Sequence, residues 1–193
     1  MTNQQSERRV AVLVAPGLEE IEGLTVVDLL FRAKVPCDTV AVAPDRTVTS
    51  SHGVTIVCDR CIEDTDLDLA AYELVVLPGG IPGTPNLAAS EAVTSELERR
   101  MANGLPVAAI CAAPTVLANL GLLEGRKATC YPDMQHVLAE HGATVEPGRV
   151  VVDGNLTTSC GMGTAIDFGL ELVAQLCSRD EADRISRGIV YAS

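Results

Sequence analysis

Leu105-Pro-Val-Ala-Ala-Ile-Cys-Ala-Ala-Pro-Thr115 is an apolar run that ends in a cluster of small residues. Residues 105–110 have the length and composition of a buried strand, and residues 116–120 have helical character. Cys111 therefore stands at a tight strand-to-helix turn, which is the geometry of a nucleophile elbow. A helix N-terminus stabilises negative charge, so we expect a lowered pKa for this thiol. The alternative is a small buried hydrophobic residue at a strand end, as most free cysteines are.

Strands and helices alternate on both sides of this stretch. We expect strands at 9–15, 38–43, 53–57, 74–77, 127–130, 150–152 and 156–158, and helices at 19–34, 90–103, 132–141, 163–177 and 180–191. This alternation predicts an α/β fold, with a mostly parallel sheet covered by helices on both faces. Hydrophobic residues make up 47% of the chain and aromatic residues only 3%, which suits such a sheet.

The length of 193 residues fits a single domain over residues 1–193, with residues 1–8 as a flexible N-terminal extension. No apolar run is long enough to span a membrane, and no signal-peptide core follows the N-terminus, so we expect a cytoplasmic protein. The net charge of −12 argues against nucleic-acid binding. Only Lys34 and Lys127 are lysines, which indicates either a salt-tolerant host or the arginine bias of a GC-rich genome.

The cysteine count is odd and the spacing scattered, which favours reduced thiols over a disulfide framework. Cys58 and Cys61 have the two-residue spacing of a metal or redox pair, but no second pair completes a zinc site. We therefore expect neither a metal nor a cofactor. The seven cysteines are Cys37, Cys58, Cys61, Cys111, Cys130, Cys160 and Cys177.

Three loops should meet where parallel strands end, because ligands bind beyond the carboxyl ends of such strands. They are residues 16–22, residues 78–80 and the turn at Cys111. Glu22 could point inward as a partly protonated acid beside the thiol, or belong to a solvated acidic helix start. Gly79 and Gly80 leave backbone amides open, so the Gly80 and Ala112 amides could form an oxyanion hole, or the glycines could form a plain turn.

Four segments, together spanning most of the chain from about Val10 to Leu176, stand in the order found in the ThiJ/PfpI superfamily. The sequence most resembles the branch that contains the parkinsonism-associated protein deglycase and bacterial YajL. The segments are Pro16-Gly-Leu-Glu-Glu-Ile-Glu22, Val75-Val-Leu-Pro-Gly-Gly80, Ala108-Ala-Ile-Cys-Ala-Ala-Pro-Thr115 and Thr158-Ser-Cys-Gly-Met-Gly-Thr164.

This resemblance implies a flavodoxin-like three-layer fold and a homodimer with its active sites near the subunit interface. It implies that Cys111 is the reactive cysteine and that Glu22 hydrogen-bonds to it. It also implies several further pocket positions: Gly79, Gly80 and Ala112 around the oxyanion hole, Glu19 and Arg32 as a charged pair, Ser159 near the interface, His52 where relatives often have an arginine from the partner subunit, and Met162 in place of a frequent proline.

Two departures from the family pattern affect the expected activity. Ala112 stands where protease-like members have a histidine, so peptide hydrolysis is not expected. Tyr131 stands where the parkinsonism-associated protein has a pocket histidine, and a phenol is a poor base near neutral pH.

The resemblance therefore implies a cofactor-independent glyoxalase or deglycase that acts on methylglyoxal, glyoxal or their early adducts with amines and thiols. The alternative is an oxidative-stress thiol sensor or holdase chaperone, which would use oxidation of Cys111.

Overall fold

A computed structural model describes residues 9–191, which contain a central sheet of seven strands. Their order across the sheet is β10-β11-β7-β6-β1-β2-β5. All neighbours are parallel except β10 and β11, which form a hairpin around residues 153–155. The strands are β1 (Val10–Val14), β2 (Cys37–Ala41), β5 (Arg60–Cys61), β6 (Leu74–Leu77), β7 (Val107–Ile110), β10 (Val150–Asp153) and β11 (Leu156–Ser159).

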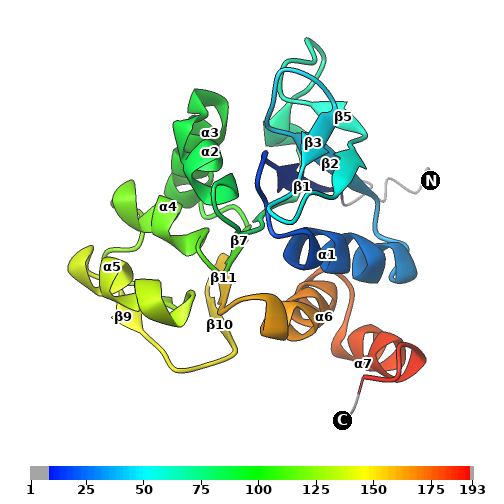
Figure 1. The fold of residues 1–193 in the computed structure, drawn as a ribbon. Helices are drawn as coiled ribbons and strands as arrows, with labels where there is room; N and C mark the ends of the chain where they lie inside the picture. The colour runs from blue at the N-terminus through cyan, green and yellow to red at the C-terminus, as the bar shows by residue number, and fades with distance from the viewer. Residues whose placement is uncertain (1–8, 192–193) are drawn as a thin grey trace, which may run out of the picture.

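Helices cover both faces of this sheet (Figure 1). One face packs against α1 (Glu20–Arg32), α6 (Ala165–Leu176) and α7 (Arg179–Gly188). The other packs against α2 (Gly83–Ala89), α3 (Glu91–Ala102), α4 (Pro114–Asn119) and α5 (Gln135–Glu140). The expected flavodoxin-like three-layer arrangement is confirmed.

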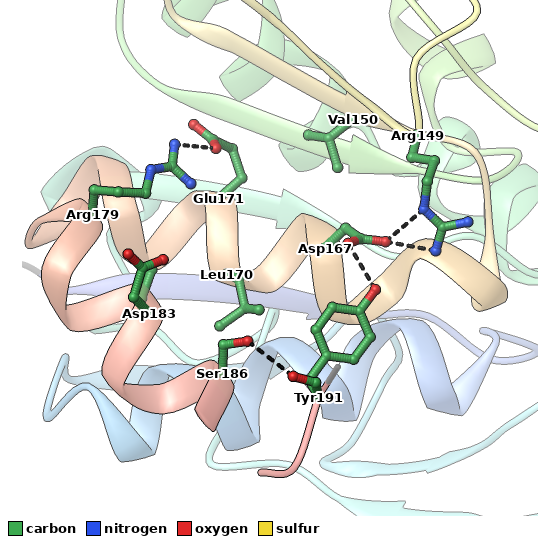
Figure 2. Close-up of a pocket in the computed structure, with 10 residues that line it drawn as sticks. Arg149, Val150, Asp167, Leu170, Glu171, Arg179, Asp183, Ser186 and Tyr191 are labelled. Carbon is green, nitrogen blue, oxygen red and sulfur yellow. Dashed lines mark hydrogen bonds and ion pairs between the residues drawn. The ribbon is translucent and has the colours of Figure 1, made fainter. Parts of the chain in front are cut away.

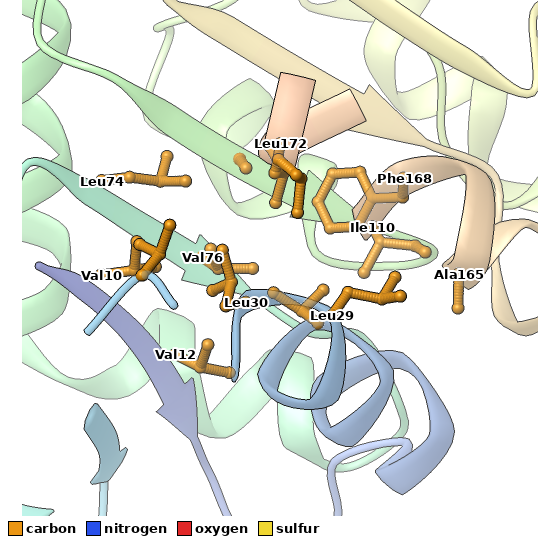
Figure 3. Close-up of a cluster of buried hydrophobic side chains, with 14 of the residues drawn as sticks. Val10, Val12, Leu29, Leu30, Leu74, Val76, Ile110, Ala165, Phe168 and Leu172 are labelled. Carbon is orange, nitrogen blue, oxygen red and sulfur yellow. The ribbon is translucent and has the colours of Figure 1, made fainter. Parts of the chain in front are cut away.

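The side-chain alternation of each strand explains the two layers. Val10 and Val12 of β1 belong to the core under α1 and α6, whereas Ala11 and Leu13 belong to the core under α2–α5. Figure 3 shows the first core, where Phe168 of α6 packs toward the sheet with Leu29 and Leu30 of α1. A central strand buried on both faces needs apolar residues at every position, as β1 has.

Several short elements differ from the sequence prediction. The strand expected at 127–130 is only β8 (Lys127–Ala128), which pairs with β9 (Thr144–Val145) outside the main sheet. The strand expected at 53–57 is β4 (Thr55–Val57), paired with β3 (Thr47–Thr49) in another small sheet. The short helix α2 and strand β5 had no clear periodicity to predict them. The described residues also contain three 3₁₀ turns: η1 (Leu69–Ala71), η2 (Pro132–Met134) and η3 (Met162–Thr164).

The parallel register brings the carboxyl ends of β1, β6 and β7 to one edge of the sheet. The loops that follow these strands contain Glu22, Gly79 and Cys111, so the predicted meeting of three loops is confirmed. Within residues 9–191, no helix is both long and apolar enough to cross a bilayer. The expected N-terminal extension, residues 1–8, lies outside the described residues.

Candidate active site

Cys111 lies in a sharp turn of the backbone between β7 and α4. Its φ of +64° is a left-handed conformation that costs a non-glycine residue of the order of 1–3 kcal/mol. Hydrogen bonds on both sides hold it there: the Cys111 amide donates to the Ser159 carbonyl at 2.9 Å, and the Tyr131 amide donates to the Cys111 carbonyl at 2.8 Å. The predicted elbow is therefore present, and it is fixed by segments far away in the sequence.

Glu22 lies in the first turn of α1 and is 1% exposed, so the inward orientation is the one adopted. Its Oε2 accepts a hydrogen bond from the Gly79 amide at 2.9 Å. Its Oε1 makes no hydrogen bond of ordinary geometry within residues 9–191. The pKa of Glu22 is raised to about 7, chiefly by burial and also by the charge of Glu19, while hydrogen bonding with Cys111 and with the Gly79 and Met162 amides lowers it.

The sulfur and the second oxygen of Glu22 face the same small space. A Cβ placed on Gly161 would lie 3.7 Å from Cys111 Sγ, 3.8 Å from Glu22 Oε1 and 3.7 Å from the ring carbon Cδ2 of Tyr131. Sequence analysis did not single out Gly161, although it stands within the segment 158–164 that carries part of the family resemblance. The thiol, the carboxyl and the tyrosine ring therefore surround one point beside this glycine.

Gly79 allows the three loops to come this close. A Cβ at Gly79 would lie 2.7 Å from Cys111 Cβ and 2.8 Å from Glu22 Oε2. Gly80 has a φ of +97°, and a Cβ there would lie 2.3 Å from the Glu19 amide nitrogen. The glycine pair is thus required by packing as well as by the turn.

The expectation of a lowered thiol pKa is wrong. Burial raises the pKa of the Cys111 thiol to about 12, and the negative charge of Glu22 adds to this shift. Hydrogen bonds from the Ala112 and Gly80 amides lower the thiol pKa, but this effect is smaller than that of burial and of Glu22. The following helix, α4, is only six residues long, so its dipole does not offset burial and the neighbouring charge.

Ser159 supports the site and does not present a free hydroxyl to it. Its side chain is fully buried, donates to the Arg149 carbonyl at 2.7 Å and lies 2.6 Å from Thr164 Oγ1. Thr164 Oγ1 in turn accepts from the Gly161 amide at 3.1 Å. This chain of polar groups, which sequence analysis missed at Thr164, holds Gly161 over the sulfur.

Arg149 stabilises the turn at residues 161–164 from the protein surface. A surface cleft of about 550 Å³ lies between β10, α6 and α7. The Arg149 guanidinium, which lines it, pairs with Asp167 (Figure 2). The Tyr191 hydroxyl also donates to Asp167, at 2.8 Å. Arg149 Nη2 donates to the Gly163 carbonyl at 2.7 Å, which connects this ion pair to the turn above Cys111.

The predicted pairing of Glu19 with Arg32 does not form within this chain. Glu19 caps the N-terminus of α1, whereas Arg32 lies at the other end of this 13-residue helix, about 20 Å away, and pairs with Asp28 at 2.7 Å. Glu19 itself stays close to the site, because its amide donates to the Gly79 carbonyl at 2.9 Å.

The exposed His52 contacts acidic groups of its own chain. Its Nδ1 lies 3.1 Å from Glu20 Oε2 and 3.6 Å from Glu19 Oε2. These three side chains are the grouping within residues 9–191 whose ligand atoms could hold a cation. Cys58 and Cys61 are both buried, and the Cys61 thiol donates to the Ala43 carbonyl at 3.0 Å. Both cysteines are therefore part of the protein interior.

The fold and the site define an α/β protein with a cysteine elbow beside a buried acid. The chain belongs to the DJ-1/PfpI family, whose model matches residues 8–175. It is 35% identical over 181 residues to protein dj-1beta of Drosophila melanogaster, which covers 94% of this chain and 96% of that protein.

Two further relatives bear on the chemistry. A Schizosaccharomyces pombe protein named glutathione-independent glyoxalase DJ-1 is 30% identical over 189 residues, which covers 94% of this chain and 97% of that protein. The solved structure of oxidized DJ-1 from Toxoplasma gondii is 34% identical and superimposes with a TM-score of 0.87, covering 96% of this chain and 99% of that one.

Proposed function

We propose that this protein is a cofactor-independent glyoxalase that converts 2-oxoaldehydes such as methylglyoxal and glyoxal to 2-hydroxy acids. One observation supports it above others: a buried carboxyl with a raised pKa has one oxygen that makes no hydrogen bond of ordinary geometry within residues 9–191 and faces the same point as the Cys111 sulfur. A base in this position can move a proton on a molecule attached to that sulfur. The name of the Schizosaccharomyces pombe relative supports the same chemistry.

The raised pKa of the thiol assigns the first proton transfer. With Glu22 ionised, its charge keeps the proton on sulfur. Transfer of that proton to Glu22 leaves the net charge unchanged and removes the repulsion, while the Gly80 and Ala112 amides stabilise the thiolate. We therefore assign Glu22 as the base that activates Cys111 when the substrate arrives.

The remaining steps balance with water as the only co-reactant. The thiolate adds to the aldehyde carbon, and the resulting oxyanion, which faces the Gly80 and Ala112 amides, takes the proton that Glu22 received from Cys111. Glu22 then removes the proton from that carbon and returns it to the neighbouring carbonyl carbon. The hydroxyl proton of the adduct passes to the neighbouring oxygen, which leaves a thioester of the 2-hydroxy acid. Water hydrolyses the thioester and frees the thiol. The aldehyde carbon is oxidised and its neighbour is reduced, so no external electron acceptor is needed.

Deglycation would use the same attack on an early adduct of an amine or a thiol. We rank it below the free aldehyde, because the Schizosaccharomyces pombe relative is named a glyoxalase. Ala112 in place of a histidine leaves no Cys–His pair at this position for peptide hydrolysis.

The test is lactate formation from methylglyoxal by the purified protein. Cys111→Ser should reduce the rate to background, and Glu22→Gln should lower kcat/KM by about 10² to 10⁴-fold. Cys177→Ser, at the end of α6, is the matched control and should retain full activity. Substantial lactate formation by either site variant would refute the assigned roles.

A second candidate function is redox sensing, with holdase activity of the oxidised protein as its output. The solved oxidized form of the Toxoplasma gondii relative favours it, because a sulfur beside a protonated acid can be oxidised to a sulfinate. Mass spectrometry of Cys111 after mild peroxide treatment separates the two candidates when run beside the lactate assay. Rapid oxidation without turnover supports the sensor.

We also propose that the protein is a homodimer whose interface includes the outer face of α1. Ile21 and Leu24 are partly exposed there, beside a cleft of about 520 Å³ that Ile166, Ile189 and Val190 also line. Leu24→Glu should yield a monomer in light scattering, whereas Val57→Glu on β4 should not change the mass. The odd count and scattered spacing of the seven cysteines support a reducing, cytoplasmic location.

A further inference from the structure

One side of the reaction space is apolar. The Tyr131 ring lies beside the point that Cys111 Sγ and Glu22 Oε1 also face, and 44% of this residue is exposed. Met162, which follows Gly161 directly, is 57% exposed. Exposed apolar side chains are ordinary when they stand singly, but here the Tyr131 ring lies near the reactive sulfur, and Met162 directly follows the glycine beside it.

Tyr131 is held firmly in this position. Its amide donates to the Cys111 carbonyl at 2.8 Å, and its own carbonyl accepts from the Met134 amide at 2.8 Å. The Cys130 thiol also donates to that carbonyl, at 3.4 Å. The ring therefore extends from a fixed backbone and loses little conformational entropy when a ligand packs against it.

Acidic residues also lie close to the site. Glu19 lies at the N-terminus of α1 with its amide bonded to Gly79, and Glu20 follows it and pairs with His52. These carboxylates disfavour an anionic substrate, and they also favour departure of a carboxylate product. The electrostatics thus select an uncharged aldehyde.

We propose that Tyr131 and Met162 make this site selective for uncharged 2-oxoaldehydes that carry an aryl group, in preference to methylglyoxal. The inference rests on the proposed glyoxalase function and specifies its substrate. With the aldehyde carbon bonded to sulfur, the substituent on the neighbouring carbonyl carbon extends toward the tyrosine ring. An aryl group there packs against the ring and contacts the methionine thioether, whereas a methyl group buries little surface.

The reaction with an aryl substrate balances as it does for methylglyoxal. Phenylglyoxal and water give mandelate, because the aldehyde carbon is oxidised to the carboxylate and the ketone carbon is reduced to the alcohol.

The experiment measures kcat/KM for phenylglyoxal and for methylglyoxal with the same enzyme, by mandelate and lactate formation. The ratio of the two cancels losses of folded protein. We expect the wild type to favour phenylglyoxal by about tenfold or more. Tyr131→Ala should lower the ratio by about two- to tenfold, and Met162→Ala by about twofold. Tyr131→Phe keeps the ring and should keep the ratio, which separates packing from the hydroxyl group.

The outcomes distinguish this inference from the function on which it rests. If both aldehydes are consumed in a Cys111-dependent manner, and Tyr131→Ala and Met162→Ala leave the ratio unchanged, the specificity is wrong and the glyoxalase function stands. If Cys111→Ser changes neither rate, the glyoxalase function is wrong and the specificity fails with it. A wild type that prefers methylglyoxal also overturns the specificity.

Discussion

Glu22 Oε1 and Cys111 Sγ face one point beside Gly161, and the pKa of each group is raised above its ordinary value. Burial raises the pKa of the carboxyl to about 7 and that of the thiol to about 12. Between these values the two groups hold one proton, and its position decides whether the sulfur or the carboxylate is the anion. The pair is therefore a base and a nucleophile that share a single proton.

This sharing predicts the pH dependence of catalysis. Below pH 7 both groups are protonated, so no base is left to activate the thiol, and kcat/KM for lactate formation should fall about tenfold per pH unit. Above pH 7 the rate should reach a plateau. The measurement is kcat/KM between pH 5 and 9, with circular dichroism as a control for folding. A rate that is flat across this range would contradict the assignment of Glu22.

The same carboxyl predicts a gain of stability when it is replaced. Its folded pKa of about 7 lies above the ordinary value of 4.5, so its stabilising effect is complete below 4.5 and is lost as the pH rises through 7. Glu22→Gln removes the ionisation and should stabilise the protein by about 3 kcal/mol at pH 8. Urea unfolding at pH 8 and pH 4.5 checks this, because the two proteins should differ little at the lower pH. If Glu22→Gln is less stable than the wild type at pH 8, other interactions in the folded protein must stabilise the buried carboxylate.

The sequence predicted the parts of the fold that need continuous burial. β1, β6 and β7 are apolar at every position, and α1 and α3 have clear helical periodicity, so each was found within a few residues. Strands of two residues, such as β5 and β9, bury too little surface to leave a pattern. Their pairing depends on segments far away along the chain.

Some features of the candidate site could likewise be predicted from the sequence, and others could not. The meeting of Glu22, Gly79 and Cys111 follows from parallel strands, so topology alone places them together. The thiol pKa depends on how completely three loops exclude water, and this cannot be predicted from the local sequence. The separation of Glu19 from Arg32 could have been predicted, because 13 helical residues place them about 20 Å apart.

Gly79→Ala should disable the site by displacing its two reactive groups. The added carbon would lie 2.7 Å from Cys111 Cβ and 2.8 Å from Glu22 Oε2, so at least one of them must move. We expect at least a hundredfold loss of kcat/KM for lactate formation and a destabilisation of about 1–3 kcal/mol. Gly188→Ala, where an added Cβ meets nothing within 4 Å, is the control and should retain activity. Normal turnover by Gly79→Ala would show that Cys111 and Glu22 can move apart without loss of activity.

Ser159→Ala tests whether this serine supports the site or contacts the substrate. Its buried hydroxyl donates to the Arg149 carbonyl at 2.7 Å and lies 2.6 Å from Thr164 Oγ1, so its loss leaves buried polar groups unsatisfied. We expect the free energy of unfolding to fall by about 1–3 kcal/mol. The KM for methylglyoxal should stay within about twofold of wild type, because the hydroxyl faces away from the reaction space and into the supporting turn. A large rise in KM at unchanged stability would instead assign Ser159 to the substrate pocket.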